Sequence, residues 1–536
     1  MTNSEAPSAG QKTSETNSKP FLIYLLCTAV LSGALVMVIE VLGSRVVGPF
    51  FGVSLFVWTS LITVTLLALA GGYAIGGMMA DRFQRPSYLF GIILLAGVLA
   101  LFIPILKGPI LKACLPLGLR GGAFASTFIL FGPVLLLLGC VSPYLVKLAA
   151  HELKNLGRVV GGLYALSTIG STVGTVLTGF VLIAYLSVDQ IFALTGGLLM
   201  ALASIYFVFF QRRWWVLVVL VLPFLLYQPQ KAVSRTMEDG TKVDLVHRED
   251  NYYGDIKVVD YSFGKTRQRE MIIDGLVQGG VDLAGYQSVY EYSYAMQFLS
   301  FMLVPEGKRC LVIGLGLGVI PSWFEKQGIQ CDVVDINPAV AEIARHYFNF
   351  KISGDVFIED ARYFLNSTDR RYDYIVLDVF SGDITPAHLL SFEAVSLMRE
   401  RLMPNGVLAV NLIGSLRQET FMTASVVKTL QSAFDVVDAF PVFDTQKSET
   451  GVGNIALMAY QGQRRELRVE HNRFQSHPRV RQNVFANLGR RYEFPKDTPA
   501  MVLTDNYNPV DFFDGWLREL IRKSILESTD WDILIS

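Results

Sequence analysis

Long runs of apolar residues occupy most of the first 230 positions of this chain, and they restrict its fold more than any other feature. A helix needs about 20 predominantly apolar residues to cross the roughly 30 Å of hydrocarbon in a bilayer. Runs of that kind occur at 21–47, 54–79, 88–106, 123–146, 159–186 and 190–210. A seventh run, 214–227, is shorter, and at 1.5 Å per residue it reaches only about 20 Å. The sequence therefore predicts an N-terminal all-α, transporter-like transmembrane helical bundle with six to seven spans.

The composition agrees with a chain that is partly embedded in a membrane. Hydrophobic residues make up 51% of the 536 residues and charged residues only 17%, which is too apolar for a soluble protein of this size. The net charge of -1 gives no global attraction to nucleic acid. The five cysteines form no CxxC pair and no Cys/His cluster, so the sequence supports neither a disulfide framework nor a zinc site.

Changes in composition divide the chain into five segments. The expected segments are a disordered, Ser/Thr-rich tail at 1–20, the transmembrane domain at 21–230, a β-strand subdomain at 231–286, a Rossmann-like domain at 287–462 and a C-terminal helical extension at 463–536. The last of these offers no clear chemistry at the level of sequence.

Basic residues near the ends of the apolar runs indicate which side each loop faces, because cytoplasmic loops are enriched in lysine and arginine. They gather in the second and fourth loops and after the sixth run, at Arg82, Arg85, Lys147, Lys154, Arg158, Arg212 and Arg213. This distribution predicts a cytoplasmic N-terminus, although Lys107, Lys112 and Arg120 would then lie outside. Six spans return the chain to the cytoplasm, whereas a seventh would export its second half.

Strands alternate with helices in the second half of the chain. Strands are expected at the segments CLVIG, CDVVD, DVFIE, YDYIVLD and GVLAVNL, with helical segments between them. Such alternation predicts a parallel, doubly wound sheet that binds its ligand beyond the C-terminal ends of the strands. The shorter segments TKVDLVH, GDIKVVDYS and RQREMIID predict a small antiparallel sheet before it.

Glycines and aspartates fall at the predicted strand ends. The turn after the first strand carries Gly314, Gly316 and Gly318. Glycines let the backbone approach a ligand closely, and Asp335 after the second strand can accept hydrogen bonds from ribose hydroxyls. Alone, this GxGxG turn leaves a dinucleotide site open. Asp360 and Asp378 follow the next two strands, where one can bind an adenine amino group and the other can face a reacting group. The series favours an adenosine-bearing sulfonium donor.

Taken together, the motifs resemble those of one enzyme family. DGLVQ, VIGLGLG, VVDINP, EDAR and LDVFSGDITPAHL occur in the order found in the spermidine synthases, the polyamine aminopropyltransferases, and the likeness covers roughly 249–460. The N-terminal segment MVIEVLGSRVVGPFFG resembles the membrane region of multi-span spermidine synthase-like proteins.

The resemblance implies a membrane-bound transferase that moves an aminopropyl group from decarboxylated S-adenosylmethionine to an amine such as putrescine, in polyamine biosynthesis. The donor site would comprise Gly314, Gly316, Gly318, Asp335, Ile336, Asp360 and Ala361. Asp378 would be the catalytic carboxylate, and the amine pocket would comprise Gln278, Tyr290, Ser381 and Asp383. The resemblance implies no metal. The expected partners are a small-molecule amine and the lipid bilayer, and the sequence leaves open whether the protein forms a homodimer. Because the donor is cytosolic, we expect a multi-pass protein of the cell membrane with a cytoplasmic C-terminal domain.

One departure from the family pattern keeps other functions open. Leu317 stands where aminopropyltransferases usually carry an aspartate that contacts the aminopropyl group. Asp383 or Glu291 would have to replace that acidic contact. One alternative is therefore a methyltransferase that uses S-adenosylmethionine to modify an amine. The other is a transporter or sensor that binds a nucleoside or polyamine without catalysis.

Overall fold

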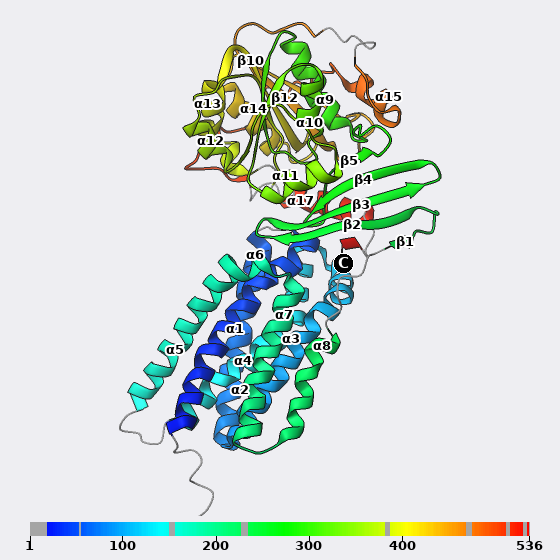
Figure 1. Cartoon of the computed structure of the whole chain (residues 1–536). Helices are drawn as coiled ribbons and strands as arrows, with labels where there is room; N and C mark the ends of the chain where they lie inside the picture. The colour runs from blue at the N-terminus through cyan, green and yellow to red at the C-terminus, as the bar shows by residue number, and fades with distance from the viewer. Residues whose placement is uncertain are drawn as a thin grey trace, which may run out of the picture. The chain divides into compact units, whose positions relative to one another are not determined.

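The chain folds as two compact units (Figure 1). A computed structural model describes residues 19–52, 55–149, 156–226, 234–380, 386–467, 474–510, 515–528 and 533–534. One unit consists of residues 1–231 with 250–254, and the other of 232–249 and 255–534, with the last two residues divided between them.

The described part of the first unit is mostly helical. Its long helices are α1 (Lys19–Phe51), α2 (Leu55–Arg82), α3 (Pro86–Cys114), α4 (Gly118–Ala149), α5 (Leu156–Leu177) and α7 (Val188–Phe209). The described part of each of the six long apolar runs is helical apart from Leu186 and Phe210. Among the described residues, five continuous apolar helical segments are long enough to cross a membrane, and one of them, Pro86–Ala149, contains both α3 and α4.

The seventh apolar run adopts a different conformation. Residues Trp214–Val221 form a 3-10 helix, η4, and Leu222–Leu226 continue it as the short helix α8. A 3-10 helix rises about 2.0 Å per residue and seldom runs this long. The segment contacts α7. It therefore differs from the six long helices in both length and geometry.

Small residues bring the helices of this unit close together. A Cβ atom added to Gly170 of α5 would lie only 2.0 Å from the carbonyl oxygen of Val30 in α1. Such close approach of backbones is typical of helix pairs in membranes, where small residues line the interface.

Two ion pairs join helices of the first unit, one between α3 and α7 and the other between α4 and α2. Lys107 Nζ lies 3.0 Å from Asp189 Oδ1, and Lys147 Nζ lies 2.8 Å from Asp81 Oδ1. Each pair joins two positions that the distribution of basic residues assigns to the same side of the membrane. The pairing also gives Lys107, which that distribution would leave outside, a carboxylate partner.

The second unit begins with the antiparallel sheet. Its strands are β1 (Ser234–Thr236), β2 (Lys242–Asn251), β3 (Gly254–Phe263), β4 (Thr266–Ile273) and β5 (Leu276–Asp282), in that spatial order. The sequence analysis identified β2, β3 and β4. The tight turn between β4 and β5 consists of Asp274 and Gly275, both with positive φ angles of 48° and 78°, as a two-residue hairpin turn requires.

The α/β domain is built on a seven-stranded sheet. Its strands are β6 (Arg309–Ile313), β7 (Gln330–Asp335), β8 (Val356–Ile358), β9 (Tyr372–Leu377), β10 (Leu402–Ser415), β11 (Val436–Pro441) and β12 (Val452–Tyr460). The spatial order is β11-β12-β10-β9-β6-β7-β8, and the five strands from β10 to β8 are parallel. The order reverses between β6 and β9, which is where doubly wound sheets bind their ligands.

One edge of this sheet departs from the parallel arrangement that the sequence predicts. β12 is antiparallel to both β10 and β11. Only a short connection, residues 442–451, joins β11 to β12. A parallel crossover needs a dozen or more residues, so these two strands pair antiparallel.

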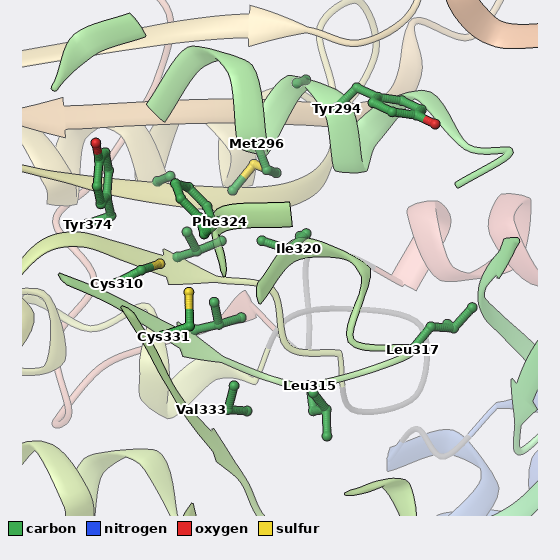
Figure 2. Close-up of a cluster of buried hydrophobic side chains, with 14 of the residues drawn as sticks. Tyr294, Met296, Cys310, Leu315, Leu317, Ile320, Phe324, Cys331, Val333 and Tyr374 are labelled. Atoms are coloured by element: carbon green, nitrogen blue, oxygen red, sulfur yellow. The ribbon is translucent and has the colours of Figure 1, made fainter. Parts of the chain in front are cut away.

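Helices cover both faces of the seven-stranded sheet. One buried cluster joins the sheet to α9 (Glu291–Leu303), α10 (Val319–Lys326) and α11 (Pro338–Tyr347), and part of it is drawn in Figure 2. The opposite cluster joins it to α12 (Ala361–Ser367), α13 (Phe392–Glu400) and α14 (Phe421–Gln431). Helices α15 (Pro478–Asn487) and α17 (Gly515–Ser528) follow the sheet in the chain. Because β6, β7, β8 and β9 are parallel neighbours in the sheet, their C-terminal ends lie along one edge.

Candidate functional site

The turn after β6 combines two packed glycines with one that faces open space. Gly314, Gly316 and Gly318 all have positive φ angles, of 91°, 49° and 76°. A Cβ at Gly314 would lie 2.2 Å from the carbonyl oxygen of Asp378, and a Cβ at Gly318 would lie 2.4 Å from the ring of Phe350. At Gly316 a Cβ would meet no atom within 4 Å. The backbone at Gly316 is therefore open to a ligand.

Asp335 is tied to this turn by its carboxylate. Oδ2 accepts a hydrogen bond from the backbone N–H of Leu315 at 2.8 Å, and Oδ1 accepts one from Asn337 N–H at 2.8 Å. Burial raises the pKa of Asp335, and the two backbone hydrogen bonds oppose that shift. Each oxygen keeps acceptor capacity for a further donor such as a hydroxyl group. The next residue, Ile336, exposes 47% of its surface and offers an apolar face beside the carboxylate.

Asp360 caps the helix that follows β8. Its Oδ1 accepts hydrogen bonds from the backbone N–H groups of Arg362 and Tyr363 at 2.9 and 3.0 Å. Asp360 is thus a helix N-cap, and Ala361, which is buried, is the first residue of α12. Its second oxygen, Oδ2, lies 3.5 Å from His388 Nε2. One carboxylate oxygen is committed to the helix, and the other faces away from the N–H groups that it caps.

Asp378 follows β9 and lies directly beside the glycine turn. Its backbone N–H donates to Ile313 O at 2.9 Å, and its Oδ1 accepts a hydrogen bond from Asn411 Nδ2 at 2.8 Å. Asn411 in turn accepts one from Asn454 at 3.0 Å. Burial raises the pKa of Asp378 to about 6, against the opposing hydrogen bond from Asn411. At neutral pH this group is a carboxylate that is more basic than an ordinary aspartate.

Sequence reasoning missed the two asparagines that support Asp378. Asn411 lies in β10 and Asn454 in β12, far along the chain from β9. The available signal was a polar residue inside the otherwise apolar segment VLAVNL.

The strand β5 contributes the opposite wall of the site. Tyr292, in α9, donates a hydrogen bond from its hydroxyl to Gln278 O at 3.0 Å. A Cβ at Gly279 would lie 3.0 Å from Leu317 Cδ1 and 3.3 Å from the Tyr292 hydroxyl. Burial raises the pKa of Tyr292 well above its ordinary value, and the nearby charge of Asp378 raises it further. Tyr292, Leu317 and Asp378 therefore lie near one another, and Gln278 contacts Tyr292 through its backbone carbonyl while its side-chain amide donates to Leu276 O at 3.4 Å.

Tyr290 and Tyr292 differ in their surroundings. The Tyr290 hydroxyl donates to Glu270 Oε1 at 2.8 Å, so its polar group is held by a buried acidic residue of β4. Tyr292, which the sequence analysis did not select, is the tyrosine near Asp378. The signal for it was the spacing of tyrosines in YEYSY, which puts Tyr290 at the helix cap and Tyr292 in the first turn.

The structure describes only some of the other residues considered for the site. Ser381 and Asp383 lie outside the described residues. Glu291, considered as a substitute acid, accepts a hydrogen bond from Asn483 of α15 at 3.2 Å. Leu317 is 5% exposed and occupies its place with a buried apolar side chain. Figure 2 draws Leu315 and Leu317 on the turn after β6, at the end of the buried cluster away from Tyr374. Within the described ranges, His, Cys, Asp and Glu side chains form no group of three or more arranged to hold a metal ion.

Comparison with known proteins identifies the domain that carries this site. The family model of the spermine/spermidine synthase domain matches residues 276–446. The part of the chain that carries the site is therefore similar to a spermine/spermidine synthase domain. The match contains the turn Gly314–Gly318, the three strand-end aspartates and Asn411. It begins at the first residue of β5 and ends between β11 and β12.

Curated relatives of the synthase domain belong to two kinds of transferase. The chain is 35% identical over 139 residues to an N-terminal histidine N-methyltransferase of Emericella nidulans, covering 25% of each chain. It is 33% identical over 123 residues to a polyamine aminopropyltransferase of Vibrio vulnificus, covering 22% of this chain and 41% of the relative. The chain thus spans less than half the length of either relative.

Among solved structures, a probable spermidine synthase from Corynebacterium glutamicum is 20% identical to the chain. The alignment covers 43% of this chain and 81% of that one, with a TM-score of 0.35.

Proposed function

We propose that the second unit transfers an alkyl group from an adenosine-bearing sulfonium donor to an amine, and that the group is aminopropyl. The observation that carries the proposal is the position of Asp378. It is a carboxylate of raised pKa at the switch point of the sheet, with its carbonyl packed against Gly314 and its side chain close to Tyr292.

The donor would lie over the open backbone of Gly316. Asp335, already fixed to the turn by Leu315 N–H, would accept the ribose hydroxyls. The exposed side chain of Ile336 would cover one face of the adenine, and Asp360 Oδ2 with the segment at Ala361 would bind its amino edge. This arrangement leaves the sulfonium group directed toward Asp378. Decarboxylated S-adenosylmethionine is the donor that this reading implies.

The reaction requires a neutral amine. A primary amine with a pKa near 10 is mostly protonated at neutral pH, so it must lose a proton before it attacks. Asp378 would bind the ammonium group, orient it and accept a proton as the nitrogen attacks. The nitrogen bonds to the carbon next to sulfur, and the carbon–sulfur bond breaks. Its electron pair stays on sulfur, which leaves as a neutral thioether. Gln278 and Tyr292 would line the acceptor side, and holding both reactants in line supplies part of the acceleration.

Methyl transfer to an amine is the second candidate, and Leu317 favours it. The aminopropyl group carries an ammonium that needs an acidic or polar contact when it leaves water. Leu317 presents a buried apolar side chain against Gly279 instead. A methyl group needs no such contact. The methyltransferase relative from Emericella nidulans supports the same reading and adds the N-terminus of a peptide to the acceptors that should be tested.

We further propose that the first unit spans the cell membrane and that the second unit works in the cytoplasm, where the sulfonium donors are made. The supporting observations are the lengths of the apolar helices and the ion pairs between residues assigned to the same side of the membrane. A reporter fused after the last described helix of the first unit tests the location. Cytoplasmic signals support the proposal, and exported signals contradict it.

The nucleoside that the donor leaves behind distinguishes aminopropyl transfer from methyl transfer. Purified full-length protein would be incubated with S-adenosylmethionine or its decarboxylated form, together with putrescine, other polyamines and a peptide that begins with histidine. Methylthioadenosine indicates aminopropyl transfer, and S-adenosylhomocysteine indicates methyl transfer. Binding of a donor or polyamine without either product would instead support a non-catalytic transporter or sensor and would refute the proposed reaction.

A further inference from the structure

A tight turn near the C-terminus lies against the donor side of the proposed site. Thr504 and Tyr507 exchange two backbone hydrogen bonds of 3.1 Å, which close the turn around Asp505 and Asn506. We call residues 503–508 the C-terminal turn. Leu503 is fully buried in the same apolar cluster as the helices α12 and α13. The turn lies outside residues 276–446, to which the synthase domain is assigned.

Asp505 connects this turn to the helix that begins at Asp360. Both of its carboxylate oxygens accept hydrogen bonds from the guanidinium of Arg362, from Nη1 at 2.7 Å and Nη2 at 2.8 Å. The backbone N–H of Arg362 donates to Asp360 Oδ1. Hydrogen bonds from the guanidinium lower the pKa of Asp505, and the carboxylate raises the pKa of Arg362. The pair is therefore fully ionised at neutral pH.

Two backbone carbonyl groups of the neighbouring 3-10 helix, η5 (Ala387–Leu389), accept hydrogen bonds from Arg362 and from the C-terminal turn. Arg362 Nη1 donates to His388 O at 3.3 Å, and Asn508 Nδ2 donates to Ala387 O at 2.7 Å. Farther along, Phe392 N–H donates to Leu503 O at 2.8 Å, and Asp505 N–H donates to Glu393 at 3.0 Å. The C-terminal turn thus contacts η5 and the start of α13 through three hydrogen bonds, and Arg362, which Asp505 holds, donates a fourth to η5.

The fixed segment faces the oxygen of Asp360 that the helix cap leaves open. His388 Nε2 lies 3.5 Å from Asp360 Oδ2. We propose that Asp505 and Asn508 are positioning residues for the sulfonium donor. They hold η5 at a set distance from Asp360, so that η5 and Asp360 form the walls around the adenine. This inference rests on the proposed function, because it requires the donor to bind at the ends of β7 and β8. Neither residue touches Asp378 or its asparagine partners, so the chemical step itself does not depend on them.

The expected signature is a loss of donor affinity with the turnover number preserved. In Asp505→Asn one carboxylate oxygen becomes an NH2 group that faces the guanidinium, so the two-pronged, charge-assisted contact is lost. We expect at least tenfold weaker donor binding and a tenfold higher KM for the donor. The turnover number at saturating donor and the KM for the acceptor should stay within about twofold. Asp505→Glu keeps both oxygens and should bind donor within about threefold of the parent.

Isothermal titration of full-length protein in detergent with S-adenosylmethionine, and separately with its decarboxylated form, tests the inference. Glu493→Gln is the matched control, because Glu493 also contacts an arginine, Arg464 at 3.2 Å, in the C-terminal part of the chain. It should bind donor as the parent does. If Asp505→Asn does not fold, Asn508→Ser carries the same test, since it removes the amide that donates to Ala387 O and that accepts a longer hydrogen bond, of 3.4 Å, from Val510 N–H.

The outcomes separate this inference from the proposed function. A parent that binds either donor, with Asp505→Asn or Asn508→Ser weakened and Asp505→Glu restored, supports it. Equal donor binding by the parent, Asp505→Asn and Asn508→Ser overturns the inference and leaves the proposed function intact. A turnover number that falls as much as the affinity, or an Asp505→Glu variant as weak as Asp505→Asn, also overturns it. A parent that binds neither donor overturns the proposed function, and this inference falls with it.

Discussion

Replacing Asp378 with asparagine should abolish turnover and at the same time stabilise the fold. The amide is nearly the same shape as the carboxylate, and its oxygen can still accept the hydrogen bond that Asn411 Nδ2 donates at 2.8 Å. It cannot take a proton from an attacking amine. Losing a positioned general base lowers rates by roughly 10²–10⁴. We therefore expect the turnover number of Asp378→Asn to fall by at least 100-fold, while the affinity for the donor stays within about threefold.

The stability effect follows from the pKa of Asp378. Burial raises it from 3.8 to about 6, a shift of about two units, and each unit corresponds to 1.36 kcal/mol. The ionised carboxylate therefore costs the folded state up to about 3 kcal/mol, with the unfolded chain as reference. A folded pKa above the unfolded one means that the folded protein binds more protons between pH 4 and pH 6. The parent should lose this stability as the pH rises through that window, whereas the asparagine variant should not.

Melting temperatures of full-length protein in detergent, measured from pH 4 to pH 8, test the reasoning. The difference in melting temperature between Asp378→Asn and the parent should be near zero at pH 4 and should widen to several degrees by pH 7. In the parent, kcat/KM for the acceptor should rise with pH through about 6, as Asp378 ionises. Asp373→Asn is the matched control. Asp373 lies at the opposite end of β9, where it accepts backbone hydrogen bonds from Lys308 and Arg309.

The control should keep its turnover number within about twofold. Normal turnover in Asp378→Asn would refute the assigned role. A gap in melting temperature that is constant with pH would refute the claim that burial raises the pKa of Asp378.

Four further substitutions follow from the site. Leu317→Asp introduces an acid beside Gly279, so the ratio of kcat/KM for decarboxylated over ordinary S-adenosylmethionine should rise at least tenfold; an unchanged ratio in steady-state assays would show that this position does not select the donor. Gly316→Ala should weaken donor binding at least tenfold in titration calorimetry because its methyl group enters open ligand space, whereas Gly314→Ala should mainly lower the melting temperature because its Cβ would lie 2.2 Å from Asp378 O. Asp335→Asn exchanges an acceptor oxygen for a donor group and should weaken donor binding about tenfold; binding equal to that of the parent would place the ribose elsewhere.

The sequence predicts those features that depend on periodicity or on local order in the chain. Apolar runs longer than about 20 residues have few alternatives to a helix, and the six long runs are helical. Gly314, Asp335, Asp360 and Asp378 share one edge because parallel strands all end on the same side of the sheet. The helix-capping geometry of Asp360 is also local, since it depends on the two N–H groups that follow it.

Features that depend on contacts between distant residues escape such reasoning. Asn411 reaches Asp378 because β10 pairs with β9, and Asp505 reaches Arg362 across 143 positions of sequence. The antiparallel edge formed by β11 and β12 depends on the length of one connection and not on the pattern within either strand. Tyr290 and Tyr292 look equivalent in the sequence pattern, but Tyr290 is the N-cap of α9 and Tyr292 lies in its first turn.

An experimental structure of the full-length protein with bound S-adenosylmethionine or its decarboxylated form tests the central claim most directly. The account predicts an adenosyl group over Gly316, its ribose hydroxyls on Asp335, its adenine near Asp360 and its sulfonium group facing Asp378. A donor bound at any other place, or a sulfonium group turned away from Asp378, would contradict it.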